Sequence, residues 1–481
     1  MGPKRAGWQL GMAEAGGQVV RITRIGALLE IRIAHPPVNA LGPEVRRALS
    51  GALDVAERDN SAAVLLRGEG GVFSAGQDMA EPLSGGTVPG LHSLCDRIEA
   101  MDKPVVAYLS GAALGGGLEL ALAAHLRLAD DSVQVALPDV HLGLTPCAGG
   151  TQRLPRLAGP AVALDLLLSG RVLGAAEALA LGLVDRVLTG DPDAELRDAA
   201  EALVAAGSWQ RTGDRRDGFR DPAAWRLAID AAREAQRGQR SGAARRIVDC
   251  VEAALLLPYE QGLAFERAAH GDLAATPEAA GLRHAFRADR AARRLPRNVA
   301  AVSSAVPQRL SVWGTGRGAI AVVRAALQSG MAVQLAEAGR AELVAALEAI
   351  AEAQEADVAA GRMTASARDA DWARLTPAVG QARLGEAEVV LTTRDDLALP
   401  APRTVLALEV GPPKGGIAVT PLVAGPGLAE LAVLSPDVAP ARAAQAVALA
   451  RRIGWDVVPT GPGGPVAVHL ATALAGAVAH L

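Results

Sequence analysis

Aromatic side chains are scarce in this sequence, whose 481 residues include only 4 Phe, 6 Trp and 2 Tyr. Base-stacking surfaces for nucleic acids and the aromatic belts of membrane proteins need more rings than this. Half of the residues are nonetheless hydrophobic and 21% are charged, which excludes a disordered chain. The length predicts about two to four domains, with cores packed mainly from Ala, Leu and Val.

An excess of one charge sign is also missing. The 48 Lys and Arg residues against 52 Asp and Glu residues leave a formal net charge of −4. No strong field is therefore available to attract a polyanion, and we expect no nucleic-acid partner.

Cysteines and long hydrophobic runs are few. Cys95, Cys147 and Cys250 lie far apart without a CxxC pair, so the sequence predicts no disulfide framework, no metal site and a reducing compartment, the cytoplasm. The N-terminus is not followed by the apolar run of an export signal. The longest uncharged stretch, residues 461–481, leaves 16 residues after Pro465, so we expect no membrane span.

Alternating strand and helix patterns predict an α/β fold for the N-terminal part. Residues 19–25 and 28–33 have the alternation of a hairpin around Gly26 and Ala27. A helical pattern over 45–56, a strand at 62–66, a helix near 91–101 and a strand at 104–109 follow.

The remaining sequence predicts two further parts. Residues 191–308 are rich in Ala, Arg and Glu and are expected to form a helical connector that ends in a linker. A new α/β unit begins near Leu310. We therefore expect three parts: residues 1–190, 191–308 and 309–481.

A first glycine cluster follows the strand at 104–109. Gly115, Gly116 and Gly117 precede a strong helix-forming segment, so their amides are expected at a helix N-terminus. Such amides can bind a phosphate or stabilise an oxyanion. The alternative, a tight turn that permits close packing of strand and helix, stays open for this segment alone.

Two acids follow this cluster at apolar positions. Glu119 lies in the first turn of the expected helix, and Asp139 lies in an apolar loop 20 residues later. Two neighbouring carboxylates can divide acid and base roles, because like charges push their pKa values apart. Asp139 alone could equally be a cap or turn residue.

The order and spacing of four motifs resemble the enoyl-CoA hydratase/isomerase (crotonase) family. These motifs occupy residues 73–78, 111–119, 137–139 and 148–155, within a similarity that covers about 19–188. The resemblance implies an N-terminal crotonase domain, a ββα spiral, that acts on an acyl-CoA thioester without a cofactor.

The resemblance also implies a role for each site residue. The backbone amides of Ala75 and Gly116 would hold the thioester oxygen as it becomes an enolate. Glu119 and Asp139 would share the positioning of water and the proton transfers, and the Gln77-Asp78 region would belong to the loop around CoA.

Two positions depart from the hydratase pattern. Asp139 stands where the pattern has Glu, and Cys147 stands where it has Gly. The shorter Asp displaces its carboxylate, and a misplacement of ~1 Å can lower a rate on the order of a hundredfold. Hydration of a 2-trans-enoyl-CoA is our first expectation, and double-bond isomerisation, which can use one acid, is the alternative.

A second glycine cluster follows the strand that begins near Leu310. Gly314, Gly316 and Ala319 form a GxGxxA turn, and Glu337 lies 21 residues after Gly316, after a second strand. This is the dinucleotide-binding fingerprint in its usual context, with Glu337 as the ribose-binding acid. It predicts a C-terminal Rossmann-like domain.

This part resembles the 3-hydroxyacyl-CoA dehydrogenase portion of multifunctional fatty-acid oxidation proteins, but its catalytic residues differ. Ala418 stands in place of the catalytic His, Ala467 in place of the Asn, and the Ser-containing segment falls at 408–410 without a Ser. Glu430 remains. The chain also ends at Leu481, before the helical domain that completes such a cleft.

We therefore expect an inactive dehydrogenase half, with NAD binding or a purely structural role both open. A non-catalytic module that binds acyl-CoA or NAD is the alternative of another class. Both an enzyme and a non-catalytic module are compatible with a homo-oligomer or with a partner from a β-oxidation complex.

Overall fold

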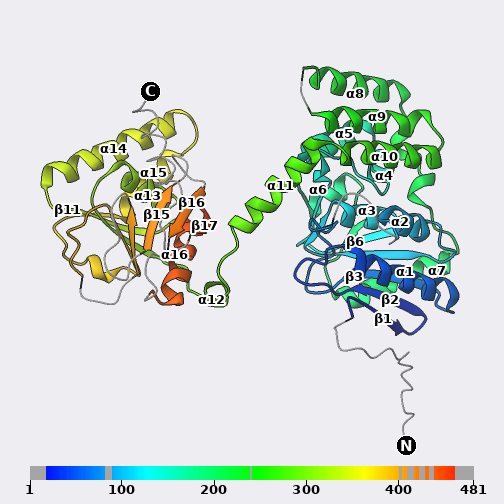
Figure 1. The fold of residues 1–481 in the computed structure, drawn as a ribbon, viewed down its shortest axis with the longest axis horizontal. Helices are drawn as coiled ribbons and strands as arrows, with labels where there is room; N and C mark the ends of the chain where they lie inside the picture. Colours follow the sequence, from blue (N-terminus) through cyan, green and yellow to red (C-terminus); the bar gives the residue numbers. More distant parts are fainter. Residues whose placement is uncertain are drawn as a thin grey trace, which may run out of the picture. The chain divides into compact units, whose positions relative to one another are not determined.

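The fold was obtained as a computed structural model that describes residues 18–81, 89–238, 241–399, 404–408, 417–421, 428–432 and 438–460. The chain forms two compact units, Met1–Arg287 and Ala288–Leu481 (Figure 1). The structure thus divides the chain near residue 287, whereas the sequence patterns predict boundaries at 190 and 308.

The first unit contains a six-stranded sheet in the order β1-β2-β3-β4-β6-β9. Only β1 and β2 pair antiparallel within it, and their register, Val20 opposite Ile33, confirms the predicted hairpin. The strands are β1 (Val20–Ile25), β2 (Leu28–Ile33), β3 (Ala63–Gly68), β4 (Val105–Leu109), β6 (Leu126–Ala129) and β9 (Arg186–Val187). A smaller sheet, in the order β5-β7-β8, consists of β5 (Ala112–Leu114), β7 (Gln134–Ala136) and β8 (Leu173–Gly174).

Helices with one apolar face cover these sheets. In α1, Val45, Leu49 and Leu53 recur at helical spacing and are buried, and Pro43 occupies the first turn, where its missing N–H costs no hydrogen bond. The helices up to β9 are α1 (Pro43–Arg58), α2 (Leu91–Glu99), α3 (Gly116–Leu122), the 3-10 helix η1 (Pro138–Leu142), α4 (Gly150–Ala158), α5 (Pro160–Ser169) and α6 (Ala175–Ala180).

The helices predicted as a connector belong largely to this first unit. α8 and α9 pack on α5, and α9 and α10 pack on α4, so they extend its core (Figure 1). Buried Trp225 of α8 belongs to the same hydrophobic cluster as the sheet residues. These elements are α7 (Pro192–Ala206), η2 (Thr212–Asp214), η3 (Asp217–Phe219), α8 (Pro222–Ala235), α9 (Gly242–Leu256), α10 (Tyr259–Ala274) and α11 (Pro277–Ala292).

The second unit has a sheet in the order β12-β11-β10-β13-β14-β15-β16-β17. All neighbours are parallel except β15 and β16, and the order reverses beside β10, as in doubly wound dinucleotide-binding folds. The Rossmann-like prediction is confirmed. The strands are β10 (Arg309–Trp313), β11 (Ala332–Glu337), β12 (Leu375–Val379), β13 (Val389–Thr392), β14 (Thr404–Leu408), β15 (Ile417–Pro421), β16 (Leu428–Ala432) and β17 (Asp456–Thr460). The helices are α12 (Arg297–Ala300), α13 (Arg317–Gln328), α14 (Arg340–Ala359), α15 (Ala365–Arg374), η4 (Leu384–Glu386) and α16 (Pro440–Arg452).

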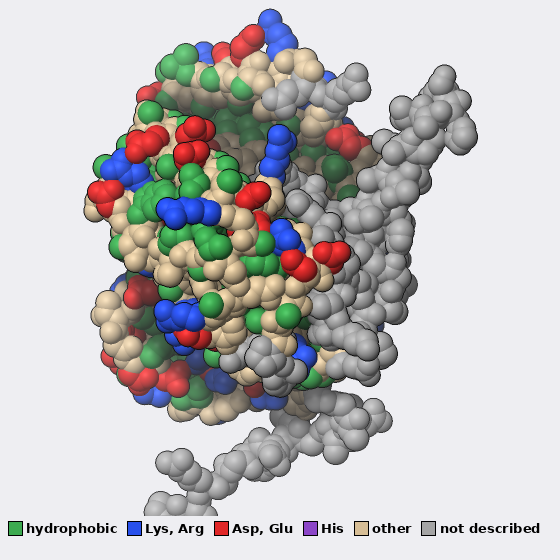
Figure 2. Space-filling view, turned by 90° about the vertical axis from the view of Figure 1, so that its left-hand side faces the viewer, with side chains coloured by type: hydrophobic (Ala, Val, Ile, Leu, Met, Phe, Trp, Pro, Cys, Tyr) green, Lys and Arg blue, Asp and Glu red, His purple; other side chains and the backbone are tan. Residues whose placement is uncertain are grey.

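Acidic and basic side chains are interspersed over the face drawn in Figure 2, in keeping with the balanced composition. Among the described residues, no helix is both long and apolar enough to cross a membrane. In the same part of the chain, no cluster of His, Cys, Asp and Glu side chains is suited to hold a metal ion.

Candidate active site

The first glycine cluster forms the turn from β5 into α3. Gly115 has a φ of 51°, in the left-handed region that favours glycine. A Cβ on Gly117 would lie 2.3 Å from the carbonyl oxygen of Ser74, so only glycine permits this approach. The turn therefore lies directly against the 73–78 segment, as a shared site requires.

Two backbone amides face this turn, and they differ from the predicted pair. The Ala75 N–H already donates to the Val38 carbonyl at 2.9 Å, so the structure contradicts Ala75 as an oxyanion donor. The Gln77 nitrogen lies 3.7 Å from the position that a Cβ on Gly116 would occupy. Neither Gln77 N–H nor Gly116 N–H donates to any described residue. The available pair is therefore Gln77 and Gly116.

Glu119 occupies the first turn of α3 and is 1% exposed. Its Oε1 accepts hydrogen bonds from the amides of Ala148, at 2.7 Å, and Gly150, at 2.9 Å. Its Oε2 is buried and has no partner among the described residues. One oxygen thus anchors the side chain and the other is available for a ligand.

Asp139 lies in η1, and its Oδ2 is likewise buried without a partner in the described structure. This oxygen is 3.9 Å from the position that a Cβ on Gly115 would occupy, which places it beside the glycine turn. The fold therefore gathers Glu119, Asp139 and the two free amides around one point, although they come from segments far apart in the sequence.

Burial changes the acidity of both carboxyl groups, and neighbouring charges add to the change at Glu119. Burial raises the pKa of Glu119 well above its usual range, and the charges of Glu266 and Asp139 raise it further. The two amides on its Oε1 oppose this shift only in part. Burial also raises the pKa of Asp139. At neutral pH the pair can hold a proton on one member while the other is ionised.

This raised pKa predicts a pH-dependent stability difference for Glu119→Gln. The unfolded chain releases the Glu119 proton near the ordinary carboxyl pKa, whereas the folded protein holds it to higher pH. The folded protein therefore loses stability as the pH rises from the ordinary carboxyl pKa to the raised pKa of Glu119. The Gln variant does not titrate and does not show this loss. We expect the melting temperature of the variant, relative to wild type, to rise by a few degrees from about pH 5 to about pH 8, at ~2–4 °C per kcal/mol. A difference that stays constant in calorimetry would contradict the raised pKa.

A cavity of about 270 Å³ is lined by Gln77, whose backbone amide is one of the two free donors. Gln77 and Asp78, the predicted CoA-binding residues, line it together with Cys147, and the Gln77 amide Nε2 lies 2.8 Å from the Cys147 sulfur. Basic side chains also line it: Arg46, His92, Arg267, His270 and Arg283. These basic side chains suit an anionic ligand.

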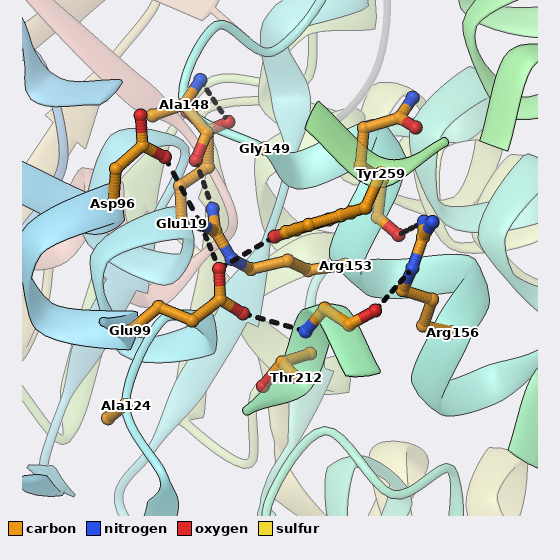
Figure 3. A network of polar contacts seen from close by, with 12 residues as sticks. Asp96, Glu99, Glu119, Ala124, Ala148, Gly149, Arg153, Arg156, Thr212 and Tyr259 are labelled. Atoms are coloured by element: carbon orange, nitrogen blue, oxygen red, sulfur yellow. Dashed lines mark hydrogen bonds and ion pairs between the residues drawn. The ribbon is translucent and has the colours of Figure 1, made fainter. Parts of the chain in front are cut away.

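A buried polar network supports the loop that holds Glu119 (Figure 3). Arg153 is 0% exposed and donates to the Ala148 carbonyl and, at 2.8 Å, to Glu99. Tyr259 donates to the same Glu99 oxygen at 2.8 Å. Because the Ala148 peptide binds Arg153 through its carbonyl and Glu119 through its amide, the network fixes the acid. The sequence patterns did not reveal it.

The second glycine cluster has the expected strand–turn–helix form. Gly314 follows β10 with a φ of 107°, Gly316 caps α13, and Ala319 is buried within that helix. Glu337 ends β11, but its carboxylate accepts from Arg394 and Thr315, both at 2.9 Å, and from the Ala338 amide at 2.8 Å. A nucleotide ribose would have to compete with these donors for the Glu337 carboxylate.

The structure describes only some of the positions at which the dehydrogenase resemblance places catalytic residues. Ala418 lies on β15 opposite Ala432 of β16, and Glu430 is opposite Thr420. Leu408 ends β14, whereas 409–410 and Ala467 lie outside the described residues. An alanine at position 418 has no group that can accept a proton.

The enoyl-CoA hydratase/isomerase family matches residues 23–210. A probable enoyl-CoA hydratase of Bacillus subtilis (strain 168) is 43% identical over 183 residues, which cover 36% of this chain and 70% of that protein. The chain belongs to the enoyl-CoA hydratase/isomerase family.

Longer relatives of this family member are multifunctional. The peroxisomal bifunctional enzyme of Danio rerio is 41% identical over 271 residues, 54% of this chain and 37% of that protein. The glyoxysomal fatty acid beta-oxidation multifunctional protein of Cucumis sativus is 30% identical over 371 residues, 73% of this chain and 51% of that protein. The second alignment extends into the second unit, and the chain spans only about a third to a half of these relatives.

Proposed function

We propose that the first unit hydrates a 2-trans-enoyl-CoA, with Glu119 and Asp139 as the acid–base pair. The observation that carries this proposal is the meeting of two buried, unpartnered carboxylate oxygens with the free amides of Gln77 and Gly116. Family membership supports an acyl-CoA thioester as the substrate.

The geometry suggests how the reaction runs. The Gln77 and Gly116 amides donate to the thioester oxygen and stabilise the negative charge that develops on it, a contribution of ~3–4 kcal/mol per donor in acyl chemistry. The ionised carboxylate of the pair takes a proton from water as the water oxygen attacks Cβ. The protonated carboxyl delivers a proton to Cα. No step needs a cofactor.

The cavity supports the orientation of the substrate. Arg267, Arg283 and His92 line it, and there they can neutralise the phosphates of CoA. The acyl end would then point past Cys147, whose side chain narrows the approach compared with glycine.

Double-bond isomerisation is the second candidate, and the short side chain of Asp139 favours it. An isomerase moves a proton between two carbons and can use a single acid, for which Glu119 with its raised pKa is suited. The same amides would stabilise the same enolate.

We propose that the second unit has no dehydrogenase activity. Ala418 cannot take the proton of an alcohol, and Arg394 competes for the ribose-binding carboxylate of Glu337. Three assays with the full chain separate these proposals. The first measures the loss of enoyl absorbance from a short 2-enoyl-CoA, and the second measures the gain of enoyl absorbance from a 3-enoyl-CoA. The third measures NADH formation from a 3-hydroxyacyl-CoA in the presence of NAD. Loss in the first assay supports hydration, gain in the second supports isomerisation, and NADH formation in the third would contradict the inactive second unit.

Asp139→Glu tests whether the shorter acid limits hydration. The added methylene moves the carboxylate by about an ångström toward the position that the family pattern uses, so we expect kcat for hydration to rise, by about tenfold. Asp139→Asn, which has the same size but no charge, should lower kcat instead. A slower Asp139→Glu would show that the pocket is built around Asp.

A further inference from the structure

Glu266 is a further buried carboxylate, and neither the sequence motifs nor the reaction proposed above uses it. It lies in the middle of α10 and is 0% exposed. Its Oε1 accepts from the Gly149 amide at 2.6 Å, and its Oε2 accepts from the Thr151 amide at 2.7 Å and the Thr151 hydroxyl at 2.5 Å. Within the described part of the chain, three donors and no bonded cation contact this buried acid, so its desolvation is offset by hydrogen bonds alone.

The donors on Glu266 alternate with those on Glu119. Along the start of α4, the amides of Ala148 and Gly150 donate to Glu119, and those of Gly149 and Thr151 donate to Glu266. The helix N-terminus is thus held between two carboxylates from different elements, α3 and α10. Moving Gly149 or Thr151 must also move the Gly150 amide that lies between them.

The contacts of Glu266 suit its ionised form. All three groups that hydrogen-bond to Glu266 are donors. The Thr151 hydroxyl also accepts from the side-chain amide of Gln152 at 3.0 Å, which leaves its hydrogen directed at Glu266. Burial raises the pKa of Glu266, while these donors and the charge of Arg153 oppose that effect. The charge of Glu266 in turn raises the pKa of Glu119.

We infer that Glu266 is a positioning residue, which fixes the first turn of α4 so that the Ala148 and Gly150 amides hold Glu119, and which places a negative charge close to that acid. This inference rests on the proposed reaction only for its kinetic part. Other ionisable groups around Glu119 are Asp139 of η1, Cys147 of the loop before α4, and Cys95 of α2. Those around Glu266 are Arg153 of α4, Cys250 of α9 and His270 of α10.

Glu266→Gln and Glu266→Asp separate charge from geometry. Gln removes the charge and turns an amide donor toward the donors of α4, so we expect kcat to fall on the order of tenfold to a hundredfold with little change in KM. The kinetic pKa assigned to Glu119 should also fall, by about one unit. Asp keeps the charge but is shorter, so kcat should fall while that pKa stays. Glu260→Gln, which removes an exposed acid from the same helix, is the matched control.

Carbon-13 NMR of labelled glutamate carboxyls tests the same idea without turnover, with the Glu119 resonance assigned by its loss in Glu119→Gln. A Glu119 titration unchanged by Glu266→Gln would overturn the inference, whatever the enzyme does. If Glu266→Gln does not fold, Glu266→Asp decides: wild-type kcat in that variant overturns the positioning role, and reduced kcat with an unchanged pKa supports it. Absence of hydration in wild type would refute the proposed function while leaving the NMR test intact.

Discussion

Glu119→Gln is expected to lower kcat for hydration by about three orders of magnitude, within the range of general acid–base catalysis. Gln has nearly the same size, and its Oε1 can still accept from the Ala148 and Gly150 amides that hold Glu119. The atom that replaces the unpartnered Oε2 is an amide nitrogen, which can neither take a proton from water nor deliver one. Because the cavity lining is unchanged, KM should change little.

The control is Glu177→Gln, which removes an acid of the same unit whose side chain is 49% exposed and pairs with Arg171 on the surface. Such a surface pair contributes little, so kcat and stability should match wild type. Steady-state kinetics across the pH range measure both variants. Turnover retained in Glu119→Gln would show that the buried acid of α3 has a structural role, and would refute the acid–base pair.

Local patterns in the sequence predicted much of this fold because they report local physics. The alternation at 19–33 follows from a sheet with two unlike faces, and the structure has this hairpin with Ile25 opposite Leu28. The glycine cluster followed by a helix-forming segment predicted the start of α3. The position of Gly316 at the cap of α13 followed in the same way from the GxGxxA spacing.

The sequence motifs could not identify the oxyanion donors, because a motif identifies a segment but not the direction in which each backbone N–H points. Whether Ala75 or Gln77 has a free N–H depends on Val38, a residue from another part of the chain. The role of α10 was missed for a similar reason. The sequence does place an acid, Glu266, between Leu263 and Ala269 on the buried face of the helix, which indicates a buried charge. Its partners Gly149 and Thr151 lie more than 110 residues away, so the sequence could not identify them.

The separation into a crotonase domain and a connector rested on the extent of the family motifs, about 19–188, and on the composition and helical pattern of the segment that follows. The Ala/Arg/Glu-rich segment forms helices with exposed and buried faces, and a composition cannot show what the buried face contacts. In the structure, Tyr259 reaches Glu99 of α2, and Glu266 reaches the start of α4. A domain cut at residue 190 would therefore lack two supports of its own acid–base site.

Gly76→Ala is expected to damage both stability and catalysis far more than Gly70→Ala. Both glycines have positive φ, 87° at Gly76 and 77° at Gly70, so either substitution adds a strain of ~1–2 kcal/mol. They differ in their surroundings. A Cβ on Gly76 would lie 2.5 Å from the Leu114 carbonyl oxygen and 3.1 Å from the Gly116 nitrogen, whereas nothing lies within 4 Å of one on Gly70.

The clash at Gly76 involves backbone atoms, so the glycine turn and the 73–78 segment must move apart. This movement separates the Gln77 and Gly116 amides, and we expect kcat to fall at least on the order of a hundredfold. Gly70→Ala should show a lower melting temperature with unchanged kcat. Thermal denaturation and steady-state kinetics of the two variants measure the contrast. Equal losses of kcat in both variants would mean that general strain, and not the spacing of the two amides, controls the rate.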